Sequence, residues 1–239
     1  MREKRKEEMN INVRNKGSYR FYDIENIGDF PSVTTIIGIL PKPKIVLWAV
    51  MQTIKFLKER GDLSKTSTSL GFVFHKQLLN SLAKEGTNIH KIIEDYVTKQ
   101  KDNDHNALTR YKEFEKQYDF KCEHSELVVW DKDEYKTAGT VDLVGKSSHI
   151  PILFDLKTSK AVRLSHKIQS CVYKELYCRL NKIDSSTMKS GILLIPRDKP
   201  KKWEVYINSP EEEIVYLRMF KILSELFYML IDLKELDLV

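Results

Sequence analysis

The stretch that decides the fold reads GTVDLV at residues 139–144 and ILFDLKT at residues 152–158. Both runs are apolar and β-branched and are bounded by polar turns, which is typical of short β-strands. Each run carries one aspartate, Asp142 and Asp155, and a carboxylate in an apolar strand is costly to bury unless it is paired or binds a cation. Because side chains alternate along a strand, Asp155 and Lys157 share a face. The pattern predicts a compact acidic pocket with one ammonium beside it, suited to Mg²⁺.

A predicted helix over residues 85–99 precedes these strands and opens with Gly86-Thr87-Asn88-Ile89-His90. His90 and Glu94 are four residues apart and therefore lie on one helix face. Imidazole nitrogen suits Mn²⁺ better than Mg²⁺, and Glu94 is placed to orient a neighbouring ligand. The other histidines have no comparable context and are interpreted as structural or surface residues: His75, His105, His124, His149 and His166.

Two further elements flank the aspartates. A strand is predicted at residues 125–130 and carries Glu126. A helix is predicted from its N-cap Ser165 to about Leu180, and on it Gln169 and Tyr173 share the face that looks toward the aspartates.

Taken in order, these residues resemble the PD-(D/E)XK nuclease superfamily in its RecB-like form. The matching motifs run from Gly86 to Tyr173, and the segment PSVTTII at residues 31–37 is similar to phage-type exonucleases and to the mitochondrial genome maintenance exonuclease. The Asp-x-Lys element alone is a weak signal. Five elements in the right order with plausible spacing are a strong one.

The resemblance implies a metal site. In it Asp142 and Asp155 bind one or two Mg²⁺ or Mn²⁺ ions, the Leu156 carbonyl and His90 add ligands, and Glu126 is an accessory ligand or a supporting acid. A metal in such a site lowers the pKa of bound water and offsets charge on the scissile phosphate.

The resemblance also implies roles for the neighbouring polar groups. Lys157 holds or deprotonates the attacking water, or stabilises the pentacovalent phosphate. Gln169 and Tyr173 orient Lys157 and the DNA backbone.

The order of the elements predicts an α/β fold with a restriction-endonuclease-like core, in which a mixed central sheet is flanked by helices, with an N-terminal helical elaboration. We expect a flexible basic tail at residues 1–16 and one domain at 17–239. Its first part, residues 17–84, holds a strand and a helical subdomain, and residues 85–239 hold the catalytic core and a C-terminal helix. The expected helices outside the core motifs cover residues 33–40, 44–60, 70–84, 107–118 and 210 onward; the expected strands cover 18–24, 125–130, 137–144, 150–157, 190–196 and 203–207.

The chain has 239 residues, a net charge of +6 and a pI near 9.0, so a polyanionic partner fits. Residues 42–76 carry seven basic and two acidic side chains. Their lysines surround Trp48 and could line a groove for single-stranded nucleic acid; alternatively Trp48 is a core residue and these helices cover the sheet. The predicted DNA contacts are Lys42, Lys44, Trp48, Thr158, Arg197 and Lys199, although the basic loop that holds Arg197 and Lys199 is also consistent with a solvated turn.

The cysteines and the hydropathy of the chain indicate the cellular compartment in which we expect the protein. Three widely spaced cysteines favour a reducing, intracellular and cytoplasmic setting over a disulfide framework. They lack the fourth member and the close pairs of an iron–sulfur site, so we expect no iron–sulfur cluster. No apolar run reaches membrane-spanning length, and the charged first residues are unlike a secretory signal peptide.

The leading interpretation is a Mg²⁺- or Mn²⁺-dependent deoxyribonuclease, and within that class an exonuclease acting on DNA ends or single strands in repair, recombination or replication. One alternative is a site-specific or structure-specific endonuclease of the same fold. Another is a non-catalytic DNA-binding member, although such proteins usually lack a ligand and Asp142, Asp155 and Lys157 are all present. If the resemblance fails, the aspartates lie at strand ends of a basic α/β domain.

Overall fold

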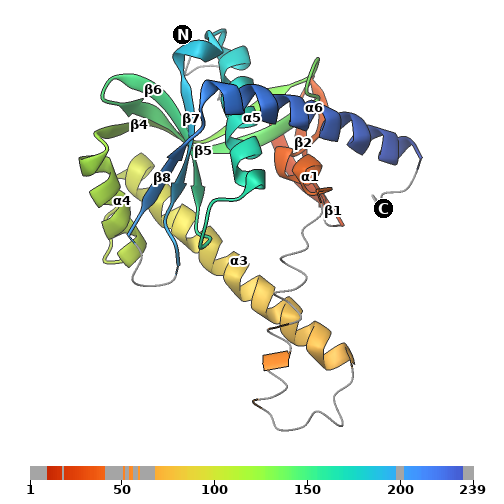
Figure 1. Ribbon diagram of the computed structural model, residues 1–239, viewed down its shortest axis with the longest axis horizontal. Coiled ribbons are helices and arrows are strands. Elements are labelled where there is room, and N and C mark those ends of the chain that lie inside the picture. Colours follow the sequence, from red (N-terminus) through yellow and green to blue (C-terminus); the bar gives the residue numbers. More distant parts are fainter. Residues whose placement is uncertain are drawn as a thin grey trace.

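The computed structural model describes residues 10–17, 19–40, 68–197 and 202–233, together with the single residues 51, 54, 55 and 59; for 68–79 and 82 it describes the backbone alone. A five-stranded mixed sheet forms the centre, in the order β4-β5-β6-β7-β8 (Figure 1). Only β6 and β7 pair in parallel. The strands are β4 (Phe120–Asp131), β5 (Thr137–Ser147), β6 (Ile150–Lys157), β7 (Lys189–Leu194) and β8 (Glu204–Ile207).

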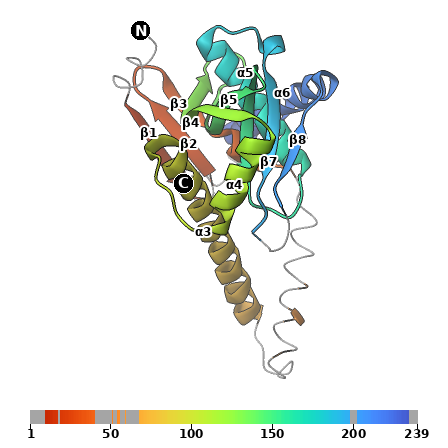
Figure 2. The same cartoon turned by 90° about the vertical axis from the view of Figure 1, so that its left-hand side faces the viewer.

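Helices cover both faces of this sheet, which confirms the predicted α/β class (Figure 2). Neighbouring residues on β6 show the two faces, because Leu153 packs into one apolar cluster and Phe154 into the other. The Leu153 side is covered by α1 (Val33–Ile37), α5 (Leu164–Asn181) and α6 (Pro210–Asp232). The Phe154 side is covered by α3 (Thr68–Lys99) and α4 (Asn106–Gln117).

The start of α6 follows its sequence signals. The Ser209 hydroxyl accepts a hydrogen bond from the Glu212 N–H, and the Glu212 carboxylate accepts one from the Ser209 N–H, with Pro210 at the first helical position. This reciprocal capping box satisfies two backbone donors that the helix leaves open.

The helix α3 differs from expectation, because two helices predicted at 70–84 and 85–99 are one helix of 32 residues. Gly86 lies inside it, where glycine costs up to about 1 kcal/mol relative to alanine. A Cβ at this position would lie 3.1 Å from the Thr158 hydroxyl, so the glycine lets the helix pass close to the end of β6. The first half of α3 extends away from the sheet (Figure 1). Most of the predicted helix at 44–60 lies outside the described residues.

An N-terminal antiparallel sheet was only partly predicted. It consists of β1 (Ile11–Lys16), β2 (Tyr19–Ile24) and β3 (Gly28–Pro31), in that order. The strand expected at 18–24 is β2, but residues 11–16 form a strand rather than a flexible tail. The side chains of β1 are exposed except for the partly buried Ile11, and its backbone pairing to β2 holds it in place.

This small sheet is attached to β5 by hydrogen bonds. The Thr137 hydroxyl donates to the Pro31 carbonyl at 2.8 Å, and the Tyr22 and Thr140 hydroxyls lie 2.9 Å apart.

Among the described residues, no helix combines the length and apolar character that a membrane span requires.

Candidate metal centre

The strands β5 and β6 separate at one end, and the two aspartates lie at this fork. Their ladder ends at the pair Leu143 and Phe154, one residue before Asp142 and Asp155. Beyond it β6 continues to pair with β7 on its other side. The freed N–H of Leu156 donates to Asp142 Oδ2 at 2.6 Å. Asp142 therefore takes the place of a strand neighbour, which fixes its carboxylate in the fork.

The alternation of faces along β5 is interrupted at Asp142. Val141 packs with the α5 cluster, whereas Leu143, two residues on, packs with the α3–α4 cluster. Opposite this point on β4 lies Glu126, between the pairs formed by its two neighbours, and its φ is +50°. A left-handed residue that is not glycine, inside a strand, costs of order 1–3 kcal/mol and persists only where its surroundings hold it. The irregular backbone directs side chains of both strands to one place.

Three of the predicted site residues meet there. The helix α3 brings His90 to Asp142, with 3.3 Å between Nδ1 and Oδ1. One ligand atom each from His90, Glu126 and Asp142 lies within 4.8 Å of the others, a grouping able to hold a metal ion. Imidazole with two carboxylates is a donor set able to hold a divalent cation.

Asp155 and Lys157 share a face as predicted, and the Lys157 ammonium lies 2.6 Å from Asp155 Oδ2. Asp155 is fully buried, yet neither of its oxygens accepts a well-directed hydrogen bond from the described residues. The side chain of Lys157 remains 19% exposed and can reach solvent. A buried carboxylate that is paired with one ammonium and has no further hydrogen-bond donor among the described residues is unusual in folded proteins.

The acidic groups at the fork differ in the direction in which their pKa values are shifted. Burial, reinforced by the Asp142 charge, raises the pKa of Glu126 to about 7. Burial also raises the pKa of Asp155 to about 7, against the opposing effect of Lys157. Burial acts on Asp142 in the same sense, but His90, Lys157 and the Leu156 N–H outweigh it and its pKa lies below the usual value. Burial lowers the pKa of His90, and the charge of Asp142 more than reverses this. The fork therefore holds more carboxylates than its cations neutralise, which favours binding of a positive ion.

Gln169 and Tyr173 lie on α5 as predicted, and Gln169 Nε2 donates to the Tyr173 hydroxyl at 3.0 Å. The Tyr173 ring packs against Gly139 of β5, where a Cβ would lie 2.4 Å from ring atom Cε1. This contact requires glycine at the start of the fork. The hydrogen bond of Gln169 goes to Tyr173. The expected role of Gln169 in orienting Lys157 stays a prediction.

The predicted DNA contacts are partly placed. The Thr158 carbonyl accepts hydrogen bonds from Arg197 Nε at 3.2 Å and from the Arg197 N–H at 3.3 Å, so both residues lie beside the end of β6. The remaining four lie outside the described residues: Lys42, Lys44, Trp48 and Lys199. The carbonyl of Leu156, expected as a ligand, also stays a prediction.

His166 is a neighbour that sequence reasoning assigned no role at the site. Burial, together with the charges of Lys157 and Arg163, lowers its pKa to about 3. Its Nδ1 accepts a hydrogen bond from the Arg163 N–H at 3.3 Å, at the start of α5. The helix begins at Leu164 with Arg163 as N-cap, rather than at the predicted cap Ser165. The sequence signal for His166 was its place in the first turn of a helix that follows the Asp-x-Lys strand.

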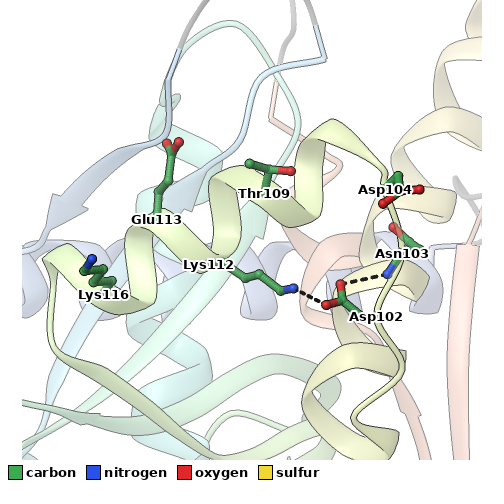
Figure 3. A pocket seen from close by; sticks show the side chains of 7 residues that line it. All are labelled: Asp102, Asn103, Asp104, Thr109, Lys112, Glu113 and Lys116. Atoms are coloured by element: carbon green, nitrogen blue, oxygen red, sulfur yellow. Dashed lines mark hydrogen bonds and ion pairs between the residues drawn. The ribbon is translucent and has the colours of Figure 1, made fainter.

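A separate hollow lies on α4 and the turn before it (Figure 3). It contains none of the residues at the fork, and its own charges are partly paired, since Lys112 binds Asp102. Its lining consists of polar and charged side chains: Asp102, Asn103, Asp104, Thr109, Lys112, Glu113 and Lys116.

No protein-family profile matches the chain, and no curated protein matches its sequence. One solved structure, "Crystal structure of SSO0001", is similar to it with a TM-score of 0.38 and 17% identity, over 75% of this chain and 70% of that one. A likeness at this level carries no argument about function.

Proposed function

We propose that this protein is a metal-dependent DNA nuclease that hydrolyses phosphodiester bonds, acting on DNA ends or single strands. The observation that carries the proposal is the fork, where His90, Glu126 and Asp142 converge beside the buried pair Asp155 and Lys157. The motif resemblance to RecB-like PD-(D/E)XK nucleases supports the same class, and the net charge of +6 supports a polyanionic substrate.

The residues at the fork fit a divalent cation. His90, Glu126 and Asp142 would hold it, and Asp155, whose oxygens lack directed hydrogen bonds, would add a further carboxylate. The raised pKa of Glu126 reflects a buried carboxylate beside another negative charge, and a bound cation would restore its ionised form. When bound, such an ion lowers the pKa of water and offsets the charge of a scissile phosphate.

The protein groups around this position have distinct tasks. Lys157 reaches solvent and can donate hydrogen bonds to a phosphate oxygen or to the attacking water. The Leu156 N–H fixes the Asp142 carboxylate. Thr158 and Arg197, joined at the end of β6, would contact the DNA backbone beside this position.

The test uses end-labelled linear and circular DNA, single- and double-stranded, with Mg²⁺, with Mn²⁺ or with chelator. We expect metal-dependent loss of linear DNA and survival of circles. Asp142→Asn should abolish cleavage, while the control Asp104→Asn, an exposed aspartate in the hollow of Figure 3, should cleave like the wild type.

Other outcomes decide against parts of the proposal. Cleavage of circles would make the protein an endonuclease of the same chemistry. DNA binding without cleavage under every metal condition would make it a non-catalytic DNA-binding protein. Cleavage that persists in chelator or in Asp142→Asn would overturn the metal site.

A further inference from the structure

The helix α6 exposes an unusual amount of apolar surface. Eleven large apolar side chains are exposed in the described part of the chain, and six of them lie on α6 or its C-cap. The opposite face of the helix already packs into the core through Phe220, Leu223 and Phe227. The helix is therefore apolar on two sides, and core packing accounts for only one of them.

Five of the six residues form a continuous stripe, here called the outer stripe. Their spacing of seven, four, three and four residues places them within about 60° around the helix axis and over about 27 Å of its length. This is the repeat of a helix–helix seam. The outer stripe consists of Val215, Ile222, Leu226, Met229 and Leu233, each between 43% and 67% exposed.

The charge of α6 argues against two kinds of partner. The helix carries five acidic and two basic side chains, a net charge of −3. Helices that lie on membranes are rich in lysine and arginine on their polar face, so this one does not fit a lipid surface. Nucleic acid would be repelled by the same charge.

We infer that the outer stripe is a dimer interface that binds the same stripe of a second copy of this chain, with the two α6 helices antiparallel. A two-fold axis beside Ile222 places Val215 of one copy opposite Met229 of the other, so that the outer stripe is covered from Val215 to Met229, and Leu233 lies beyond it at the end of the pair. The partner face is thus the same patch, as a two-fold interface requires.

Two charges bordering the outer stripe fix the direction. Arg218 and Glu225 are exposed, lie two turns apart and flank the outer stripe on the same side. In the antiparallel arrangement Arg218 of each copy meets Glu225 of the other, twice per dimer. In a parallel pair in register this flank of one helix lies on the opposite side of the seam from the same flank of the other, so Arg218 and Glu225 would not meet and the two opposite-charge contacts would be lost. The acidic ends, Glu211 and Asp232, lie at the rim of this pair, where water and salt screen them.

The experiment measures the association of the full chain by sedimentation velocity over a wide micromolar range. We expect a concentration-dependent dimer, and Ile222→Glu should leave a monomer with an unchanged melting temperature. The control is Ile150→Glu, which alters another exposed isoleucine, at the start of β6, and should still dimerise.

A charge exchange tests the antiparallel direction. Arg218→Glu and Glu225→Arg should each weaken the dimer by about tenfold, since each replaces two opposite-charge contacts with like-charge contacts. The double variant should regain an affinity close to that of the wild type. A chain that stays monomeric at all concentrations, a dimer that Ile222→Glu leaves intact, or a double variant no better than the single ones would overturn the inference. Equal loss in Ile150→Glu would also overturn it.

Discussion

Two buried lysine–carboxylate pairs in this fold have opposite surroundings. Lys174 is 4% exposed and binds Glu213, and its ammonium also donates to the carbonyls of Ser185 at 3.0 Å and Met188 at 3.3 Å. The other Glu213 oxygen accepts from Ser190 at 2.7 Å. Every partner of this pair is supplied by the fold, so its charges are held in one geometry.

The pair Lys157 and Asp155 lacks these partners. Asp155 is fully buried, but its oxygens accept no well-directed hydrogen bond from the described residues, and Lys157 remains partly exposed. Removing one partner of a completed buried pair is strongly destabilising because it leaves the other charge buried and unpaired, whereas an incomplete pair stays only where something else is gained. Chemistry is therefore expected where the fold leaves a charge short of partners, at Asp155, rather than at the completed pair of Lys174 and Glu213.

The largest expected effect concerns cleavage. Asp155→Ala should lower the rate of DNA hydrolysis by at least about a thousandfold, because removing a charged ligand removes several kcal/mol of transition-state stabilisation. Glu213→Ala, in molecules that remain folded, should cleave at a rate close to that of the wild type. Binding to DNA, measured by fluorescence anisotropy, should survive in both. A normal rate in Asp155→Ala would show that the incomplete pair has no catalytic role.

The next effect is on stability, and here the completed pair of Lys174 and Glu213 is expected to matter more than the pair of Lys157 and Asp155. Lys174→Met should lower the free energy of unfolding by about 3–5 kcal/mol, because it leaves Glu213 buried and without its cation. Lys157→Met should cost less than about 2 kcal/mol, since the pKa of Asp155 is already near 7 and the carboxyl can take up a proton. Denaturation by urea measures both. Equal losses would mean that the two pairs are structurally equivalent.

How far the sequence predicts the difference between the two pairs depends on how many residues separate the partners along the chain. The period of two along β6 was sufficient to place Asp155 beside Lys157, and the pair is found there. Lys174 and Glu213 are 39 residues apart, on different helices, and no local pattern indicates that they meet. Burial of Lys174 depends on tertiary packing that a single sequence does not display.

The fork shows the same division. The motif order predicted that His90, Glu126 and Asp142 belong to one site, and the structure brings them together. The interruption of alternation at Asp142 and the positive φ of Glu126 opposite it were not predictable, because neither aspartate nor glutamate in a strand pattern gives a sign of irregular backbone. The sequence pattern suggested two helices that meet between residues 84 and 85, whereas one helix continues through Gly86, which allows the close passage of α3 beside Thr158.

A third effect separates metal binding from the lysine. A metal at one hundred times its Kd should stabilise the folded protein by about 2.7 kcal/mol. Mn²⁺ should therefore raise the melting temperature of the wild type and of Lys157→Ala, since lysine is not a ligand, but not that of Asp142→Ala. Thermal melts with and without Mn²⁺ measure this directly. A melting temperature of Lys157→Ala that no longer responds to Mn²⁺ would place the lysine within the metal site.

The smallest effect concerns a third pair, Lys167 and Glu212, which is more exposed than the other two. Glu212 accepts hydrogen bonds from Tyr206, the Ser209 N–H and Tyr216 and lies 3.3 Å from the Lys167 ammonium. The Tyr206 hydroxyl, followed by these other donors, lowers the pKa of Glu212 to about 2. A carboxyl with a depressed folded-state pKa stabilises the protein above its unfolded pKa, here about 4.5. The stabilisation is lost as pH falls from there toward 2.

Glu212→Gln should therefore be less stable than the wild type near neutral pH by about 1 kcal/mol, a value limited by the exposure of the group. The gap should close below pH 4.5, because the wild-type carboxyl then gains its proton too. Urea titrations at several pH values measure the gap, and Tyr206→Phe is the matched variant, since it removes the main donor but keeps the carboxylate. In Tyr206→Phe the addition of Glu212→Gln should cost less than it does in the wild type. A difference in stability that stays constant from pH 7 to pH 3 would mean that the hydrogen bonds of Glu212 do not favour its charged form. The pair of Lys167 and Glu212 would then contribute nothing to stability through its charge.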